Sequence, residues 1–316
     1  KIILIKIDFI YKMCNNITMK KIAILGGTFN PIHNEHIELC KSAVKELALD
    51  MLYVMPTYIS PHKTLAPASA TDRLNMLKLA FKDTDKIEVS DFEIEKQGKS
   101  YTYQTVEHFY NKDNRLYFIM GGDMLVDFKT WRYPERILDK CTIAVFDRQN
   151  FYTDFEKERE YFKATFNKDF IKLNYVGKDA SSTKIRTYAK FGLDISHLTD
   201  KSVAKYIADN NLYEPDVYQQ FVINHLPEKR LKHTANVVVC ALKRAKELGL
   251  DSQKVELTAT LHDLAKYIDY RAISGFNLPQ GVPNPVVHAF LGAYIAQNFL
   301  KIDDEEIIDA IRYHTS

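Results

Sequence analysis

A short apolar run that ends in two glycines and continues into a helical pattern is the feature that most constrains this fold. Residues 20–40 read KKIAILGGTFNPIHNEHIELC, and the run KIAIL is bounded by Gly26 and Gly27. A run of this length suits a strand buried on both faces of a parallel sheet. Ile37 and Cys40 then begin the apolar spacing of a helix. The segment therefore predicts the first strand–helix unit of a parallel sheet.

Strand-like and helical segments alternate from this point to about residue 213. Thr71 or Asp72 is available to cap one of the helices. The alternation predicts an α/β fold with a doubly wound parallel sheet and helices on both of its faces. Beyond the first unit, strands are expected at residues 51–56, 86–94, 115–123 and 141–147, and helices at 36–47 and 71–81.

The alternation of strand-like and helical segments ends after residue 216. Long amphipathic stretches occupy residues 232–250 and 254–268, and Gly249 stops the first of them. A loop rich in proline, glycine and asparagine follows at residues 277–285. No convincing strand pattern occurs in this half, so it predicts an all-helical second domain.

Two domains and a short extension are therefore expected. The first domain covers residues 19–214 and the second covers 217–316. Residues 1–18 are expected to lie outside the fold, because Met19 directly precedes the first strand and the chain begins with lysine. This extension does not fit a signal peptide, since charged residues interrupt its apolar run and no small-residue cleavage site follows.

Charge and cysteine content exclude several classes of partner. The net charge of +2 comes from 43 basic and 41 acidic residues, which argues against a basic nucleic-acid-binding surface. No apolar run approaches the roughly 20 residues of a membrane span. The four cysteines show no CxxC spacing, which favours a reduced chain. We therefore predict a cytoplasmic protein without nucleic-acid or membrane partners, and an oligomer stays open.

The first strand–helix unit has the features of a phosphate site. Gly26 and Gly27 let the backbone come close to a ligand, and the start of a helix attracts an anion. His33 and His36 lie three residues apart, on one side of the first helical turn, where both can donate hydrogen bonds to phosphate oxygens. A structural glycine turn followed by loop histidines is the alternative. The order strand, glycines, histidines and helix favours the phosphate site.

Five ordered motifs resemble those of a known family. GGTFNPIHNEH (26–36) is similar to the signature GGTFDPxHxGH of the HxxH nucleotidyltransferases, which have a Rossmann-like fold. The resemblance, over residues 19–213, is strongest to the nicotinate mononucleotide adenylyltransferases. The other four matching segments are PTYISPHK (56–63), EVSDFEIEKQGKSYTYQTV (88–106), FIMGGDMLVDFKTW (118–131) and DASSTKIR (179–186).

The resemblance implies transfer of the adenylyl group of ATP to nicotinate mononucleotide, giving deamido-NAD and pyrophosphate in NAD biosynthesis. Mg²⁺ would enter with the ATP phosphates. Trp131 would stack on the pyridine ring, although a core aromatic is the alternative for it. The implied catalytic residues are His33, His36 and Arg186. The implied ATP-binding residues are Gly26, Gly27, Thr28, Phe29, Gly121, Asp123, Ser182 and Thr183. The residues implied to bind nicotinate mononucleotide are Lys63, Tyr101, Thr102 and Trp131.

The first motif departs from the family pattern at two positions. Asn30 stands where aspartate is common, and Glu35 stands where a small residue is usual. A carboxylate beside a triphosphate repels it, so Glu35 is expected to point away from the site.

The helical half holds a second set of candidate ligands. A single buried histidine is usually a core residue, whereas several imidazoles with a carboxylate suit iron, manganese or zinc. Asp263 could bridge two such ions. The predicted metal ligands are His233, His262, Asp263, His288 and His314.

This second set resembles the HD-domain phosphohydrolases. The segments RLKH, LHDLAK and AIRYHTS are most similar to the branch that hydrolyses diadenosine tetraphosphate symmetrically to two ADP. The resemblance implies a divalent transition metal, iron or manganese, and diadenosine tetraphosphate as a partner. Lys266 would hold a phosphate or, equally, lie in solvent. Because the family pattern continues to a further aspartate beyond Ser316, the HD domain is expected to be truncated at its C-terminus.

Two alternatives stay open at this point. The first domain could be another HxxH nucleotidyltransferase that acts on phosphopantetheine or glycerol phosphate, although Tyr101, Thr102 and Trp131 oppose this. The HD half could be a non-catalytic module that senses a nucleotide. The preference for the acid or the amide mononucleotide is also open.

Overall fold

The computed structural model describes residues 19–59, 66–149, 151–178 and 180–315. Its contacts form two compact units, the first ending at Ala180 and the second beginning at Ser181. The predicted extension at 1–18 lies outside the described residues.

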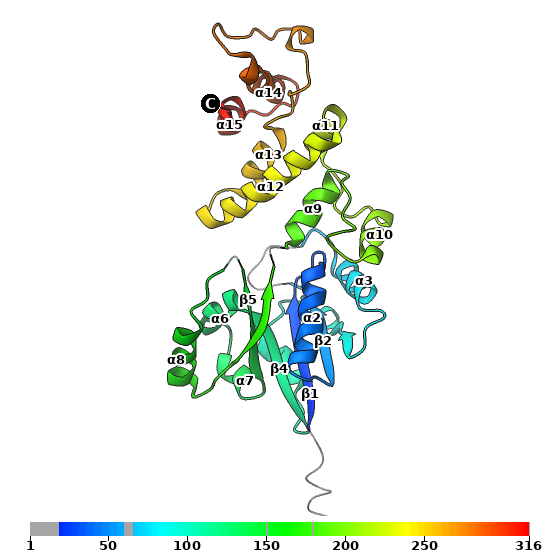
Figure 1. Cartoon of the computed structure of the whole chain (residues 1–316), viewed down its shortest axis with the longest axis vertical. Helices are drawn as coiled ribbons and strands as arrows, with labels where there is room; N and C mark the ends of the chain where they lie inside the picture. The colour runs from blue at the N-terminus through cyan, green and yellow to red at the C-terminus, as the bar shows by residue number, and fades with distance from the viewer. Residues whose placement is uncertain (1–18, 60–65, 150, 179, 316) are drawn as a thin grey trace, which may run out of the picture. The chain divides into compact units, whose positions relative to one another are not determined.

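Six parallel strands form the sheet of the first unit, in the order β3-β2-β1-β4-β5-β6 (Figure 1). The chain winds outward from β1 in one direction and from β4 in the other, which confirms the predicted doubly wound α/β fold. The strands are β1 (Lys20–Gly27), β2 (Met51–Pro56), β3 (Ile87–Val89), β4 (Asn114–Gly121), β5 (Thr142–Arg148) and β6 (Ile171–Gly177).

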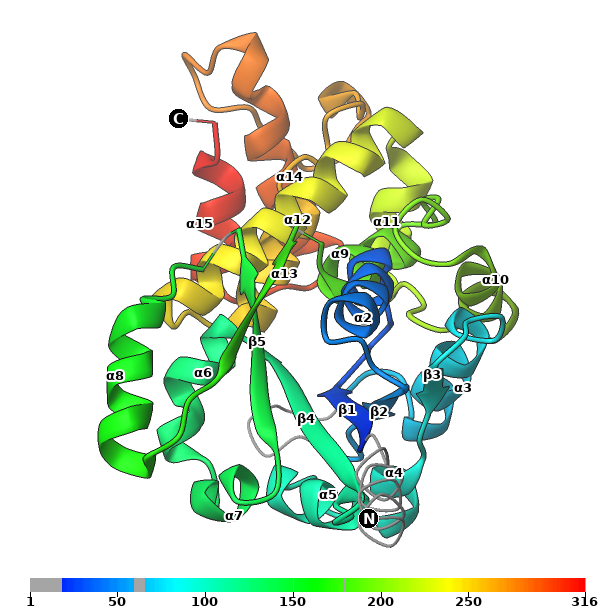
Figure 2. The same ribbon diagram turned by 60° about the horizontal axis from the view of Figure 1, so that its bottom comes forward.

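Helices cover both faces of this sheet. One face and its helices α5, α6, α7 and α8 share a core in which Phe118 and Val145 pack with Phe128 and Phe162. Helices α2 and α3 lie against the opposite face (Figure 2). The helices of this unit are α2 (Asn34–Glu46), α3 (Ala70–Ala80), α4 (Phe92–Lys96), α5 (Thr102–Phe109), α6 (Gly122–Asp127), the 3₁₀ turn η1 (Phe128–Thr130), α7 (Pro134–Leu138) and α8 (Phe155–Phe166).

The strand register places the two glycine turns at one edge of the sheet. Gly27 ends β1 opposite Pro56 of β2, and Gly121 ends β4 opposite Phe146 of β5. Because β1 and β4 are parallel neighbours, both glycines lie at the carboxyl edge, where the winding direction reverses. Ligands of such sheets bind at this point.

Two local predictions were wrong. The strand expected over 86–94 ends at Val89, because the Ser90 hydroxyl accepts the Phe92 N–H and the Asp91 carbonyl starts a helical turn. The cap of α3 is Ser69 rather than Thr71 or Asp72; its hydroxyl accepts the N–H of Asp72 at 3.0 Å.

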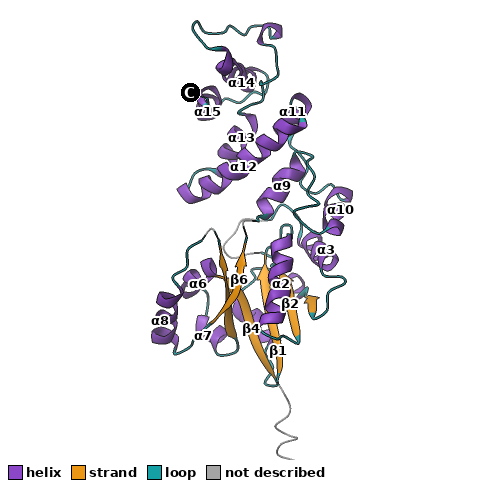
Figure 3. Ribbon diagram, viewed as in Figure 1, coloured by secondary structure: helices purple, strands orange, loops and turns teal. Residues whose placement is uncertain are grey.

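Among its described residues the second unit consists of helices and loops and contains no strand, and residues 217–315 within it are all-helical as predicted (Figure 3). Gly249 ends the longest helix in the left-handed conformation expected of a stop residue. The helices are α9 (Ser182–Lys190), α10 (Lys201–Asp209), α11 (Val217–His225), α12 (Glu228–Leu248), α13 (Ser252–Leu261), η2 (Tyr270–Ala272), η3 (Asn284–Val286), α14 (Val287–Asn298) and α15 (Glu305–Tyr313).

No helix among the described residues is long and apolar enough to cross a membrane. The unit boundary at Ser181 falls earlier than the predicted domain boundary at 214–217, because α9 packs against α12. The domain boundary inferred from the sequence stays a prediction.

Candidate active sites

His33 and His36 form a stacked pair at the start of α2. His33 is the N-cap residue of this helix, and the two rings lie 3.5 Å apart with an interplanar angle of 16°. The N–H of His36 donates to His33 Nδ1 at 3.3 Å, and the N–H of His33 donates to His36 Nδ1 at 3.4 Å. The three-residue spacing that motivated a phosphate site thus also builds a reciprocal helix cap.

This cap fixes the tautomer of both rings. A ring nitrogen that accepts a backbone N–H carries no proton, so each neutral imidazole carries its proton on Nε2. A proton on Nε2 can be donated to a ligand oxygen. The edge of the Phe29 ring packs on His36, with ring centroids 5.0 Å apart, and limits how far the pair can move.

The His33 ring is neutral at physiological pH. Burial lowers the pKa of His33 to about 4, with the positive charge of Arg148 lowering it further and the Glu35 carboxylate opposing the shift. A neutral imidazole can still donate one N–H to a phosphate oxygen. The negative charge of bound phosphate would then raise this pKa.

The low pKa of His33 predicts a loss of stability in mild acid. In the unfolded chain the imidazole takes up a proton near pH 6.5, but in the folded chain only near pH 4, so protonation favours unfolding as the pH falls between these values. The loss at full extent is roughly 3 kcal/mol. In His33→Asn, which keeps a capping acceptor, we expect a smaller drop in the free energy of unfolding from pH 7 to pH 4.5, measured with urea. An equal drop in both proteins would contradict this assignment.

The Glu35 side chain forms hydrogen bonds to the edge strand β6 and to the residue that follows it. Its Oε2 accepts the Tyr175 hydroxyl at 2.7 Å and the Lys178 N–H at 2.9 Å. Burial alone would raise the pKa of Glu35, but these two hydrogen bonds lower it below its usual range. The carboxylate therefore ties α2 to β6 and its following turn. This partner is 140 residues away in the chain, and no local pattern indicates it.

A buried arginine fixes the loops that follow β1 and β2. Arg73 on α3 donates to the carbonyl oxygen of Thr28 at 2.9 Å and to that of Tyr58 at 3.3 Å. Its side chain is almost fully buried. Thr28 thus lies in a rigid turn. The sequence reasoning missed Arg73, although its spacing of three and four residues from the buried Met76 and Leu77 places it on the buried face of α3.

Asp123 follows the second glycine turn, at the start of α6. Its Oδ1 lies 3.6 Å from Nε of Arg148, which ends β5. A Cβ atom at Gly121 would overlap the Asp123 carboxylate, so a larger residue there would force this side chain to move. The structure thus brings Asp123 and Arg148 together at the carboxyl edge. Arg148 was not among the predicted site residues, although it directly ends a predicted strand.

The residues assigned to nicotinate mononucleotide lie on two neighbouring segments. Trp131 is half-buried, and its ring packs on Phe128 and Phe118 with centroids 5.2 Å and 6.1 Å apart. Tyr101 caps α5, and Arg132 lies over its ring at 5.0 Å, so the structure joins the two segments. Thr102 is the first residue of α5, and Lys63 lies outside the described residues.

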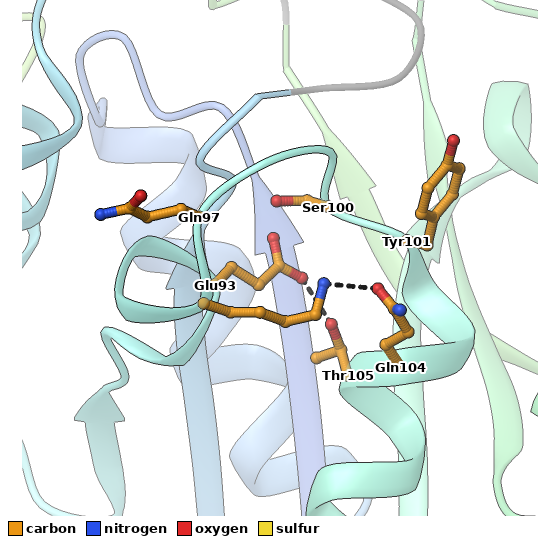
Figure 4. Close-up of a pocket in the computed structure, with 7 residues that line it drawn as sticks. Glu93, Gln97, Ser100, Tyr101, Gln104 and Thr105 are labelled. Atoms are coloured by element: carbon orange, nitrogen blue, oxygen red, sulfur yellow. Dashed lines mark hydrogen bonds between the residues drawn. The ribbon is translucent and has the colours of Figure 1, made fainter.

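A buried carboxylate supports the segment that carries Tyr101. Thr105 of α5 donates its hydroxyl to Glu93 Oε1 at 2.6 Å, and burial raises the pKa of Glu93 although this hydrogen bond opposes the shift. Figure 4 shows Glu93 and Thr105 facing each other below Ser100, while the Tyr101 ring points away from them. Glu93, in the DFE segment at residues 91–93, therefore has the structural role of holding α5 in place.

The remaining residues predicted to bind the phosphates of ATP lie at the start of α9. Ser181 caps this helix by accepting the N–H of Lys184, and Ser182 and Thr183 are its first two residues. Arg186 donates to the Thr183 hydroxyl at 3.1 Å. The structure thus groups Ser182, Thr183 and Arg186 at one helix end in the second unit.

The five predicted metal ligands converge in the second unit. These residues form two groups, and within each group the possible ligand atoms lie within 4.8 Å of one another. His233 and His262 belong to one group, His288 and His314 to the other, and Asp263 belongs to both. His288 Nε2 lies 3.1 Å from Asp263 Oδ1, and His262 Nε2 lies 3.6 Å from Oδ2. The arrangement fits an aspartate that bridges two ions.

Backbone carbonyls orient two of these rings. His262 Nδ1 bonds to the carbonyl oxygen of Ala259 at 2.7 Å, and His314 Nδ1 bonds to that of Ile311 at 2.7 Å. A carbonyl only accepts, so Nδ1 carries the proton and Nε2 is free to bind a metal. Burial alone would raise the pKa of Asp263, but the side chains of His288 and His314 beside it hold this pKa well below its usual range.

Two cations flank this cluster. Arg230 lies one turn before His233 on α12 and donates to Asp263 Oδ2 at 3.0 Å. Lys266 Nζ lies 3.2 Å from His288 Nε2, so it faces the cluster and not only solvent. The sequence reasoning missed Arg230, although its spacing of three residues from His233 places both on one helix face.

Comparison with known proteins decides the family. A family model described as cytidylyltransferase-like matches residues 24–188. The chain is 41% identical over 201 residues to a Clostridium tetani protein named "Probable nicotinate-nucleotide adenylyltransferase", with 62% of this chain and 100% of the relative covered. The chain belongs to the nicotinate-nucleotide adenylyltransferase family. The predicted family membership is therefore confirmed.

The second unit is matched as well. An HD-domain model covers residues 230–316, and an HD domain implies dependence on a divalent metal, in agreement with the histidine–aspartate cluster. A Mycoplasma genitalium protein named "Probable nicotinate-nucleotide adenylyltransferase/Ap4A hydrolase" is 30% identical over 313 residues, which is 94% of this chain and 82% of that relative. The name of this relative combines an adenylyltransferase and an Ap4A hydrolase in one protein.

Among solved structures, the Plasmodium falciparum nicotinic acid mononucleotide adenylyltransferase complexed with APC is similar, with a TM-score of 0.48 and 21% sequence identity. The match covers 61% of this chain and 97% of that chain.

Proposed function

We propose that the chain transfers the adenylyl group of MgATP to nicotinate mononucleotide, giving deamido-NAD and pyrophosphate. The names of its relatives support this reaction. The observation that carries the proposal is the His33–His36 pair, whose two Nε2–H donors lie at the carboxyl edge of the sheet. Phosphoryl transfer without a covalent enzyme intermediate needs mainly such positioned donors and charges.

In the proposed reaction a phosphate oxygen of the mononucleotide attacks the α-phosphorus of ATP. The bond from this phosphorus to its bridging oxygen breaks, and pyrophosphate leaves. His33 and His36 would donate to the α- and β-phosphate oxygens as charge builds up on them. Arg148, already beside Asp123, would add positive charge at the same edge. Ser182, Thr183 and Arg186 are assigned to the remaining phosphates by resemblance.

We further propose that the HD unit hydrolyses a nucleotide polyphosphate such as diadenosine tetraphosphate. His233, His262, Asp263, His288 and His314 would hold iron or manganese. A divalent ion bound there supplies Lewis acidity for the attack of water on a phosphorus. Arg230 and Lys266 lie where they could hold the phosphates of the substrate.

A substrate panel tests the transferase proposal. Full-length protein with MgATP is offered nicotinate mononucleotide, nicotinamide mononucleotide, phosphopantetheine and glycerol phosphate in parallel, and adenylylated products are separated by chromatography. We expect deamido-NAD as the main product. Product formed only from phosphopantetheine or glycerol phosphate would overturn the proposal in favour of another HxxH nucleotidyltransferase.

A further inference from the structure

Helix α9 is held by the two helices that lead into the metal cluster. It packs directly against α12, as Figure 2 also shows. The hydroxyl of Tyr188, a buried residue of α9, donates to Asn236 Oδ1 on α12 at 2.8 Å. A hydrogen bond of this kind fixes how α9 is rotated on α12, because Tyr188 cannot turn without losing its partner.

A second contact joins α9 to α13. Lys190 Nζ, in the last turn of α9, lies 2.7 Å from Glu256 Oε1, and both side chains are only 29% exposed. Burial lowers the pKa of Arg186, and the negative charge of Glu256 opposes this shift. The contact with α12 and the contact with α13 together fix the orientation of α9 better than either one alone, because they hold it at two different points.

Both supporting helices also carry candidate metal ligands. Asn236 lies one helical turn after His233 on α12, and α13 ends directly before His262. These helices are therefore part of the HD domain, although α9 belongs to the match with the cytidylyltransferase-like family. An isolated surface helix of nine residues has little stability of its own, so its geometry depends on such packing.

We propose that Asn236 and Glu256 of the HD domain are positioning residues for the adenylyl transfer, which act through Tyr188, Lys190 and Arg186 on the phosphate-binding end of α9. This inference rests on the proposed function, in which the start of α9 binds the phosphates of ATP. The HD domain then serves the first reaction as a support, independently of any hydrolysis.

Steady-state kinetics of the full-length protein test this proposal. For Tyr188→Phe, Asn236→Ala and Glu256→Gln we expect the KM for ATP to rise about threefold to tenfold, as loss of one partly buried hydrogen bond implies. The KM for nicotinate mononucleotide should stay unchanged, which a general loss of structure would not produce. Tyr188→Phe removes a single hydroxyl and keeps the ring, so it retains the packing of α9.

Glu247→Gln is the matched control. Glu247 also lies on a helix of this domain and pairs with an arginine at 2.7 Å, but its partner Arg244 is on the same helix α12. This variant should leave both KM values unchanged. An unchanged KM for ATP in Tyr188→Phe and Glu256→Gln, or an equal rise for both substrates, would overturn the proposal.

Failure of the proposed function itself would look different, because the wild-type protein would then form no dinucleotide. In that case calorimetric titration with MgATP tests the role of α9 alone. Weaker binding in Glu256→Gln than in Glu247→Gln would support the positioning role, and equal dissociation constants would overturn it.

Discussion

Replacement of His36 by alanine should lower kcat/KM for deamido-NAD formation by about 10²–10³-fold, as expected for loss of one donor to a transition-state oxygen. The Nδ1 atom of His36 is occupied by the His33 N–H, so only Nε2 can serve the substrate. The variant also removes the ring that stacks on His33 at 3.5 Å, which frees the second donor to move. Both effects act on the transition state more than on folding. Steady-state kinetics with MgATP and nicotinate mononucleotide measure the loss.

His108→Ala is a suitable control for this experiment. His108 also stacks on an aromatic ring, that of Phe92 at 3.8 Å, but it lies on the exposed face of α5 far along the helix from Tyr101. We expect its activity to equal that of the wild type. If His36→Ala kept more than about a tenth of the wild-type kcat/KM, its ring would have a structural role only, since the lost interaction would be worth less than 1.4 kcal/mol.

Local patterns were sufficient to predict the parts of the fold that depend on nearby residues. The run KIAIL, the two glycines and the helix after His33 follow from strand burial, turn geometry and apolar spacing within about twenty residues. The stop at Gly249 follows from the backbone freedom of one residue. Where two local signals competed, the prediction was wrong: Ser90 and Asp91 ended the strand that the apolar pattern continued.

Contacts between distant residues could not be predicted. The hydrogen bond between Glu35 and Tyr175 depends on β6 lying near α2, which only the finished sheet order determines. The same holds for Asp123, which lies just after β4, and Arg148, which ends the neighbouring strand β5. The ligand types of the metal cluster were predicted from the histidines and the aspartate of the helical half and from the family resemblance. Their distances could not be predicted, because the ligands lie far apart in the chain.

The largest effect in the second unit is expected for Asp263→Asn. Asp263 belongs to both groups of candidate ligands, so its charge serves every ion that the cluster can hold. Asparagine keeps the shape but removes the negative charge that draws the ligand histidines and Arg230 together. If the proposed function holds, we expect the variant to purify without iron or manganese and to hydrolyse diadenosine tetraphosphate at least about 10³-fold more slowly, a loss of roughly 4 kcal/mol. Metal analysis of the purified protein and chromatography of the ADP product measure the two losses separately.

Asp309→Asn is the control for an aspartate-to-asparagine change outside the metal cluster. Asp309 also accepts an arginine, Arg312, at 2.6 Å, but it lies on the exposed face of α15 and belongs to neither ligand group. This variant should retain metal and hydrolysis, and both variants should retain adenylyl transfer. Stoichiometric metal in Asp263→Asn would show that the cluster does not hold the ion. If the wild-type protein instead bound metal but did not hydrolyse the substrate, the result would favour an HD domain that binds a nucleotide without cleaving it. The metal ligands would then be in place while the hydrolytic activity was missing.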